Sequence, residues 1–291
     1  MQIGVVFPQT ELGGSPTAVR TYAEGVEALG FSHLLAYDHV LGADPEAHHP
    51  WKGPYDVRTT FHEPFVMFGF LAGFTQLELV TGIIILPQRQ TALVAKQAAE
   101  VDLLTGGRFR LGVGAGWNPV EYEALGESFH TRGKRFDEQI PLLRRLWTEE
   151  VVTHDGGFDQ VTGAGLAPMP VQRPIPIWVG GQSAPAYRRM GRLADGWFPQ
   201  VRPGPPLEEA LAIIGEAAEE AGRDPAAIGM EGRVSWTSDG VEKLVDHVGR
   251  WQAAGASHLT INTMGAGLAN VDEHLEVLAT TAEAVGVRSA R

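Results

Sequence analysis

The sequence of 291 residues contains no cysteine and no long apolar run, and its acidic residues outnumber its basic ones. The absence of cysteine excludes disulfides, thiolate metal sites and cysteine nucleophiles. Because no run of eighteen apolar residues exists, no membrane-spanning helix is expected. Lys and Arg total 23 against 35 Asp and Glu, which gives a formal net charge of -12. Such a charge repels phosphate backbones, so nucleic acid is not expected as a partner.

The amino-terminal segment also lacks the features of a targeting signal. It enters the apolar residues 3–7 directly, with no basic region and no cleavage site. We therefore expect no signal peptide, and a cytoplasmic protein. What the chain does have is 44% hydrophobic residues, which is enough to bury a large core.

Short β-like runs alternate with longer amphipathic helical ones along the whole chain. Strands are predicted at residues 2–8, 33–37, 79–86, 108–114, 175–180, 196–199, 230–236 and 258–262. Helices are predicted at residues 16–29, 91–104, 133–147, 207–221, 240–253 and 271–284. Eight such units of roughly 36 residues predict one α/β domain over residues 1–291, a (β/α)8 TIM barrel. A doubly wound open sheet is the alternative, and residues 38–62 and 154–174 are expected to be loop insertions.

Glycines and tryptophans gather at the predicted carboxyl ends of the strands, where the active site of such a barrel lies. The strand at 108–114 has one bulky apolar face, and its other face carries Arg110 and two glycines, of which Gly114 ends the strand. Gly116 and Trp117 follow it. Glycine lets a flat ligand approach the backbone closely, although a tight turn uses the same residues. With Trp197 on a later strand, the pattern predicts a site for a large aromatic ligand.

A second glycine pair, Gly180 and Gly181, leads through Gln182 and Ser183 into a predicted helix. Free backbone amides at a helix start bind phosphate well. The alternative is an ordinary turn in which Ser183 caps the helix. The segment is not a Walker loop, because no Gly-Lys-Ser/Thr follows. Residues 112–117 do not form a dinucleotide fingerprint either, because Trp117 occupies the third glycine position.

Asp38 and His39 form the only acid–base pair at a predicted strand end. Histidine titrates near neutrality, so His39 could move a proton or polarise a substrate oxygen, although a loop histidine bonded to backbone is the alternative. Further histidines at positions 48, 49 and 62 are expected to be solvated loop residues. No paired histidines end the first strand and no nucleophile elbow is present, so neither a metal-dependent hydrolase nor a serine hydrolase is predicted.

Charged residues also cluster near the start of the helix predicted at 133–147. Arg132 and Arg135 could reach an anionic ligand, but we expect them to form ion pairs with Glu121 or Glu138. These residues are therefore interpreted as structural.

The chain resembles the luciferase-like monooxygenase superfamily and, within it, the branch that uses the deazaflavin coenzyme F420. The resemblance covers nearly the whole length and rests on the runs at residues 105–118, 174–181 and 195–197. It implies a (β/α)8 barrel that holds a flavin or deazaflavin at the carboxyl ends of the strands. It also places a non-proline cis peptide behind the ring, at Gly82–Ile83 or at Ile83–Ile84.

The resemblance further implies roles for individual residues. The turn from Gly180 to Ser183 matches the phosphate turn of the family, and Asp38-His39 matches the place where a sugar-phosphate dehydrogenase of this branch holds a histidine near the reactive ring carbon. This chain departs from that dehydrogenase at Trp117, where the relative carries a glutamate proton donor. A glucose-phosphate substrate is therefore not implied.

Together these observations predict an F420-dependent oxidoreductase that transfers a hydride between the cofactor and a small organic substrate. An FMN-dependent monooxygenase that uses reduced flavin and oxygen is the first alternative, and a non-catalytic flavin-binding protein is the second. His39 is the predicted proton-transfer residue, no metal is predicted, and a homodimer is possible since such relatives commonly dimerise. The predicted cofactor-binding residues are Asp38, Gly82, Ile83, Ile84, Gly114, Gly116, Trp117, Gly180, Gly181, Gln182, Ser183 and Trp197.

Overall fold

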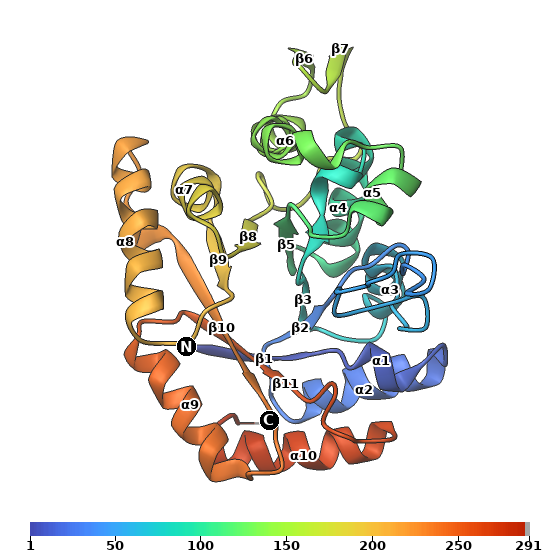
Figure 1. Ribbon diagram of the computed structural model, residues 1–291, viewed down its shortest axis with the longest axis vertical. Coiled ribbons are helices and arrows are strands. Elements are labelled where there is room, and N and C mark those ends of the chain that lie inside the picture. Colours follow the sequence, from blue (N-terminus) through green and yellow to red (C-terminus); the bar gives the residue numbers. More distant parts are fainter. Residues whose placement is uncertain (289–291) are drawn as a thin grey trace.

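The computed structural model describes residues 1–288, and its parallel strands form a closed barrel surrounded by helices (Figure 1). Pairing between β3 and β5 closes the ring, so the predicted (β/α)8 barrel is confirmed and the open sheet is excluded. The barrel strands are β1 (Gln2–Val6), β2 (His33–Ala36), β3 (Glu78–Thr81) continued by β4 (Ile84–Ile85), β5 (Phe109–Gly114), β8 (Ile177–Gly181), β9 (Gly196–Pro199), β10 (Gly229–Ser235) and β11 (His258–Asn262).

The helices lie outside the ring, and the six predicted ones begin and end close to their predicted positions. In chain order the helices are α1 (Gln9–Leu12), α2 (Pro16–Ala28), α3 (Pro64–Leu71), α4 (Thr91–Thr105), α5 (Pro119–Ala124), α6 (Arg132–Thr148), α7 (Ala184–Leu193), α8 (Pro205–Glu220), α9 (Val241–Ala253) and α10 (Val271–Val285). Short 3-10 turns cover Leu86–Gln88, Phe129–Thr131 and Pro225–Ala227. Within residues 1–288, no helix has both the length and the apolar character needed to cross a membrane.

The short helices α1, α3 and α5 were not predicted, and two further segments differ from the sequence-based prediction. The strand predicted at 79–86 is divided into β3 and β4, and the break contains a cis peptide bond at Gly82–Ile83, the first of the two positions that the resemblance implied. The insertion at 154–174 is not all loop. It contributes to an antiparallel hairpin of β6 (Val152–Asp155) and β7 (Gln160–Ala164), which projects beyond the barrel at the top of Figure 1.

Strand alternation divides the core into two parts, because successive side chains point to opposite faces of the sheet. The larger part lies between the sheet and the helices. A smaller cluster fills the barrel interior and consists of Val6, Leu35, Val80, Trp178 and Phe198, with Tyr37 and Ile83 packed against it.

An ionic cluster also lies inside the barrel. The Arg110 guanidinium contacts Glu231 at 2.5 Å and Glu78 at 3.0 Å, and it stacks 4.3 Å from the ring centre of Trp178. His33 Nε2 lies 3.0 Å from the other Glu231 oxygen. Burial opposes ionisation of Glu231, but Arg110 and His33 outweigh it and hold its pKa at about 2. This cluster joins side chains of β2, β3, β5 and β10.

Candidate functional site

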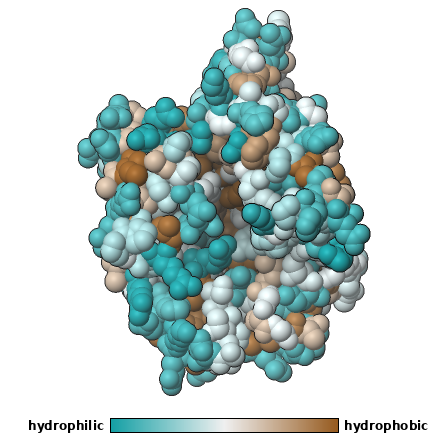
Figure 2. Space-filling view, in the orientation of Figure 1, coloured by the Kyte–Doolittle hydropathy of each residue, from teal (hydrophilic) through white to brown (hydrophobic). Residues whose placement is uncertain are grey.

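A cavity of about 700 Å³ opens at the carboxyl ends of the barrel strands. Figure 2 shows the hollow at the centre of this face, with apolar residues inside and hydrophilic residues around it. The cavity brings together most of the residues predicted for the site: Asp38, His39, Gly82, Ile83, Gly114, Gly116, Trp117, Gly180, Gly181, Gln182 and Ser183. A single ligand of flavin size can therefore contact β2, β4, β5 and β8 at once.

Two predicted cofactor residues do not line the cavity. Trp197 is 1% exposed and packs edge-on against Tyr187 of α7, with ring centres 6.0 Å apart, on the outer face of β9. Ile84 is fully buried in the core between sheet and helices. The physical reason is strand alternation, which turns Phe198 and Ile83 inward when their neighbours point outward. The predictions for Trp197 and Ile84 are therefore corrected.

The side chain of Ile83 lies against two glycines on the neighbouring strands. A Cβ built on Gly114 would come 2.4 Å from Ile83 Cδ1, and one on Gly180 would come 3.3 Å from Ile83 Cγ2. A side chain at Gly114 would collide with Ile83, and one at Gly180 would crowd it. The two glycines therefore make room for the Ile83 side chain, which forms an apolar wall of the cavity.

The turn between β8 and α7 has the form expected of an anion site. Gly181 has a φ of +155°, which favours glycine. Ser183 is the N-cap of α7, and its Oγ accepts a hydrogen bond from Ala186 N at 3.4 Å. Pro185 has no N–H and Ala186 N is used by the cap, so the backbone amides of residues 182–184 are those that remain at the positive end of the helix dipole. The capping role of Ser183 is thus compatible with an anion at these amides.

Arg132 adds a guanidinium to the lining of this cavity. Its Nη1 donates to the Phe129 carbonyl at 2.7 Å, and its guanidinium lies 3.8 Å from the Phe129 ring centre. A hydrogen bond from Arg189 Nη2 to Gly133 O, 3.1 Å long, ties the first turn of α6 to α7. Arg132 thus lines the cavity, a position that the structural interpretation made from the sequence did not foresee.

The structure contradicts the ion pairs predicted between the arginines of α6 and Glu121 or Glu138. Within residues 1–288, Arg132 has no carboxylate within ion-pair distance, and Arg135 pairs with Glu127. Glu138 instead accepts hydrogen bonds from the backbone amides of residues 157–159 at 2.9–3.0 Å. Position 138 faces the β6–β7 hairpin, which the sequence pattern did not reveal.

The buried carboxylate of Glu121 holds His39, although the sequence suggested Glu121 as an ion-pair partner of the arginines on α6. The contact is made by one His39 ring nitrogen, Nδ1, which lies 3.5 Å from Glu121 Oε2. Glu121 Oε1 also accepts from the amides of Val40 and Leu41, at 2.5 and 3.2 Å. Burial opposes ionisation of Glu121, but these partners lower its pKa below the usual value. Edge contacts to the His39 ring come from the rings of Tyr55, Phe61 and Trp117.

Asp38 is not available as a free base. Arg89 Nη2 donates to both of its carboxylate oxygens at 3.0 Å, and the same guanidinium contacts Glu63. Burial raises the pKa of Asp38 although Arg89 opposes the shift. Asp38 therefore fixes the loop that carries His39.

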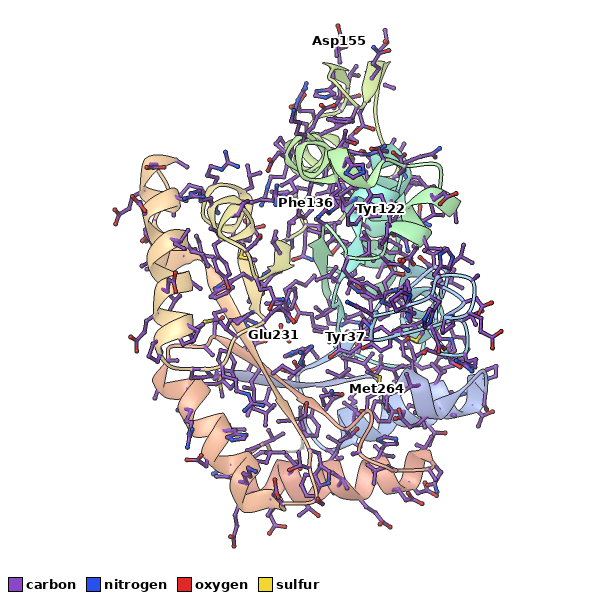
Figure 3. All side chains as sticks on the ribbon, in the orientation of Figure 1. Tyr37, Tyr122, Phe136, Asp155, Glu231 and Met264 are labelled. Carbon is purple, nitrogen blue, oxygen red and sulfur yellow. The ribbon has the colours of Figure 1, made fainter. Side chains whose placement is uncertain are left out.

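The inward face of β10 carries functional candidates that the sequence analysis missed. Glu231 and Arg233 line the cavity together with Tyr37, and Figure 3 shows Glu231 and Tyr37 near the centre of the ring. Arg233 Nη1 donates to the Tyr37 hydroxyl at 3.0 Å. The available signal was the alternation of these charged residues with Met230 and Val234, which point outward.

Comparison with known proteins agrees with this architecture. The family model described as luciferase-like monooxygenase matches residues 1–285. An uncharacterized protein of Mycobacterium tuberculosis is 35% identical over 231 residues, which are 77% of this chain and 80% of that protein. An F420-dependent glucose-6-phosphate dehydrogenase of Segniliparus rotundus is 28% identical over 224 residues, 74% of this chain and 62% of that protein.

Among solved structures, the long-chain alkane monooxygenase LadA superposes with a TM-score of 0.81. The match covers all of this chain and 92% of that one, at 13% sequence identity, so it speaks for the fold alone. The family match over nearly the full length and the shared barrel establish that this chain belongs to the luciferase-like monooxygenase family.

Proposed function

We propose that this protein is an oxidoreductase that uses coenzyme F420 to transfer a hydride to or from a small organic substrate. One observation carries the proposal. The wall formed by Ile83, Gly114 and Gly180 and the anion turn at Gly181–Ser183 line one cavity, at the place where F420 relatives of the family are expected to hold their cofactor.

The residues present fit a phosphorylated tricycle. The planar ring would lie against the side chain of Ile83, which Gly114 and Gly180 accommodate. Its phosphate would take hydrogen bonds from the turn before α7 and from Arg132, whose fork of N–H donors suits phosphate oxygens. When bound, the deazaflavin supplies hydride chemistry at its ring, and the protein supplies position and charge.

His39 would hold and move the proton that accompanies the hydride. Its Nδ1 faces Glu121, and its Nε2 has no hydrogen-bond partner among the described residues. Glu121 fixes the ring orientation, so Nε2 is the nitrogen that can give or take a proton from a substrate oxygen. Trp117 and Tyr55 cover the ring and restrict the access of water.

Sequence similarity favours F420 over FMN. The F420-dependent dehydrogenase of Segniliparus rotundus matches by sequence, whereas LadA, a monooxygenase, matches in fold. Both cofactors carry a ribityl phosphate, so the turn before α7 accommodates either. An FMN-dependent monooxygenase is therefore the second candidate function.

Fluorescence titration with F420 and, separately, with FMN tests the proposal. We expect F420 to bind with a dissociation constant at least tenfold lower than that of FMN. Arg132→Gln should weaken F420 binding by about ten- to a hundredfold, because a charge-assisted hydrogen bond is lost. Arg188→Gln is the matched control, because Arg188 is exposed on α7, the helix that follows the phosphate turn. This variant should bind F420 as tightly as the wild type. Tight FMN binding with no F420 binding would replace the first candidate with the second.

A further inference from the structure

The carboxylates that line the cavity are already neutralised within the protein. Asp38 receives two hydrogen bonds from Arg89, each 3.0 Å long. One oxygen of Glu231 contacts His33 and the other contacts Arg110. Neither carboxylate therefore presents an uncompensated negative charge to a ligand.

Two arginines that line the cavity are, in contrast, not neutralised by a carboxylate of the described residues. Within residues 1–288, neither Arg132 nor Arg233 has a carboxylate within ion-pair distance, whereas Arg189 is paired with Asp137. The whole chain carries a formal net charge of -12. The excess charge in its main cavity is positive and so has the opposite sign. Such a cavity attracts anions.

Arg233 lies on a different part of the ring from the phosphate turn. It lies on β10, in register with Thr260 of β11, and β9 separates this strand from β8. Its nearest inward neighbour along β10 is Glu231, whose oxygens are occupied. The exposed guanidinium of Arg233 therefore keeps donors that no described residue uses.

Tyr37 completes a two-residue arrangement with Arg233. The Tyr37 hydroxyl accepts from Arg233 Nη1 at 3.0 Å, which leaves its own O–H free to donate. Burial raises the pKa of Tyr37, although Arg233 opposes the shift, so the hydroxyl keeps its proton. Arg233 and Tyr37 thus present N–H and O–H donors side by side, the pattern that an oxyanion requires.

We propose that Arg233 and Tyr37 bind the anionic group of the substrate, and that the substrate is a small organic acid, a carboxylate or a phosphate ester. This proposal rests on the proposed function, because that function gives the Arg132 end of the cavity to the cofactor. The rest of the substrate would lie among the apolar and aromatic side chains of the cavity, which include Tyr55, Trp117 and Phe198.

The first test locates anions in crystals soaked in selenate, whose anomalous signal marks each bound ion. In the wild type we expect one selenate at the turn before α7 and a second beside Arg233. Arg233→Gln should lose only the second, and Arg132→Gln should lose or weaken only the first. A missing first ion with the second present would count against the proposed function and not against the role of Arg233, and a missing second ion overturns that role.

The second test measures selectivity in solution by calorimetry, with benzoate, phenyl phosphate and the neutral analogue benzamide as probes. The wild type and the control variant Arg188→Gln should bind at least one of the two anions at least tenfold more tightly than benzamide. Arg233→Gln should abolish that preference, and whichever anion binds more tightly identifies the oxyanion. Arg233→Gln should leave F420 affinity unchanged, with folding checked by circular dichroism.

Three outcomes of the second test would also overturn the proposal. Equal binding of all three probes by the wild type means that any selenate at Arg233 is an adventitious ion only. A preference that survives in Arg233→Gln places the anion elsewhere. A tenfold or larger loss of F420 affinity in Arg233→Gln assigns the arginine to the cofactor.

Discussion

Gly181 is the residue at which backbone geometry most directly limits the cavity. Its φ of +155° and the 2.9 Å distance from a built Cβ to Ala186 Cβ mean that any side chain must displace the turn before α7. We predict that Gly181→Ala weakens F420 binding at least tenfold, measured by fluorescence titration.

The matched control for this prediction is Gly265→Ala. Gly265 also has a positive φ, +77°, but a Cβ there meets nothing within 4 Å and the residue does not line the cavity. Both variants should lose about 1 kcal/mol of stability to backbone strain, and only Gly181→Ala should lose affinity. Equal affinity in the two variants would remove Gly181 from the phosphate site.

Glu231 makes the stability of the protein depend on pH. Its folded-state pKa of about 2 lies below the ordinary value of 4.5, so the folded state favours the carboxylate. Its stabilisation is complete above the unfolded pKa and is lost as pH falls from about 4.5 toward 2. We predict that Glu231→Gln lowers the free energy of unfolding at pH 7 by on the order of 3 kcal/mol, measured by urea unfolding.

The same variant should also reduce the slope of stability against pH below 4.5. Glu216→Gln, at an exposed position in the middle of α8, should leave both the stability and the slope unchanged. An unaltered slope in Glu231→Gln would show that this carboxylate is not held ionised by Arg110 and His33.

One side-chain hydroxyl adds to the backbone pairing that closes the barrel between β3 and β5. Thr81 Oγ1 donates to Gly112 O at 2.7 Å and accepts from Gly112 N at 2.8 Å, and Thr81 is fully buried. A Cβ on Gly112 would come 1.8 Å from Thr81 O, so this glycine serves strand packing and not ligand approach. On the glycine-rich face of β5, Gly112 is therefore required for strand packing, whereas Gly114 lines the cavity.

We predict that Thr81→Val lowers the free energy of unfolding by about 2–4 kcal/mol, because a nearly isosteric change leaves a buried N–H and a buried C=O without their partner. Chemical denaturation measures the loss. Thr280→Val, whose hydroxyl bonds within the exposed face of α10, should lose far less. Similar losses in both variants would contradict the closing role of Thr81.

Sequence periodicity predicted the strands and the long helices well, because each follows from local alternation or helical spacing. The strand at 196–199 and the strand at 258–262 match their predicted bounds. The hairpin of β6 and β7 was missed, since its residues are mostly exposed and lack an apolar alternation. The inward or outward direction of Trp197 was also missed, because the register of β9 is set by its neighbours.

At the scale of the whole molecule, the β6–β7 hairpin projects beyond the barrel (Figure 1), and none of the described residues that line the cavity comes from it. Glu138 holds its turn by accepting hydrogen bonds from three successive backbone amides. We predict that Glu138→Ala increases proteolytic cleavage within residues 155–160 and leaves F420 affinity unchanged. Limited proteolysis with mass spectrometry measures the first effect, with Glu208→Ala as control, and resistance equal to that of the wild type would contradict the anchoring role.

The glycines at the strand ends, Asp38 and His39 could be placed at one site from the sequence, because parallel strands of a barrel end on the same face. The side chains that pair with the residues of this site could not be predicted from the sequence. Glu121 lies 82 positions from His39 along the chain, and Arg233 lies 196 positions from Tyr37. Only the closed ring brings such distant side chains together, so pairings of this kind require the three-dimensional structure.

A crystal structure of the protein with F420 would show where the cofactor lies. We expect its phosphate within hydrogen-bond distance of the Arg132 guanidinium and of the backbone amides of residues 181–184, and its ring against Ile83, Gly114 and Gly180. A cofactor phosphate bound elsewhere, or a ring on the far side of the cavity from Ile83, would contradict the proposed cofactor site.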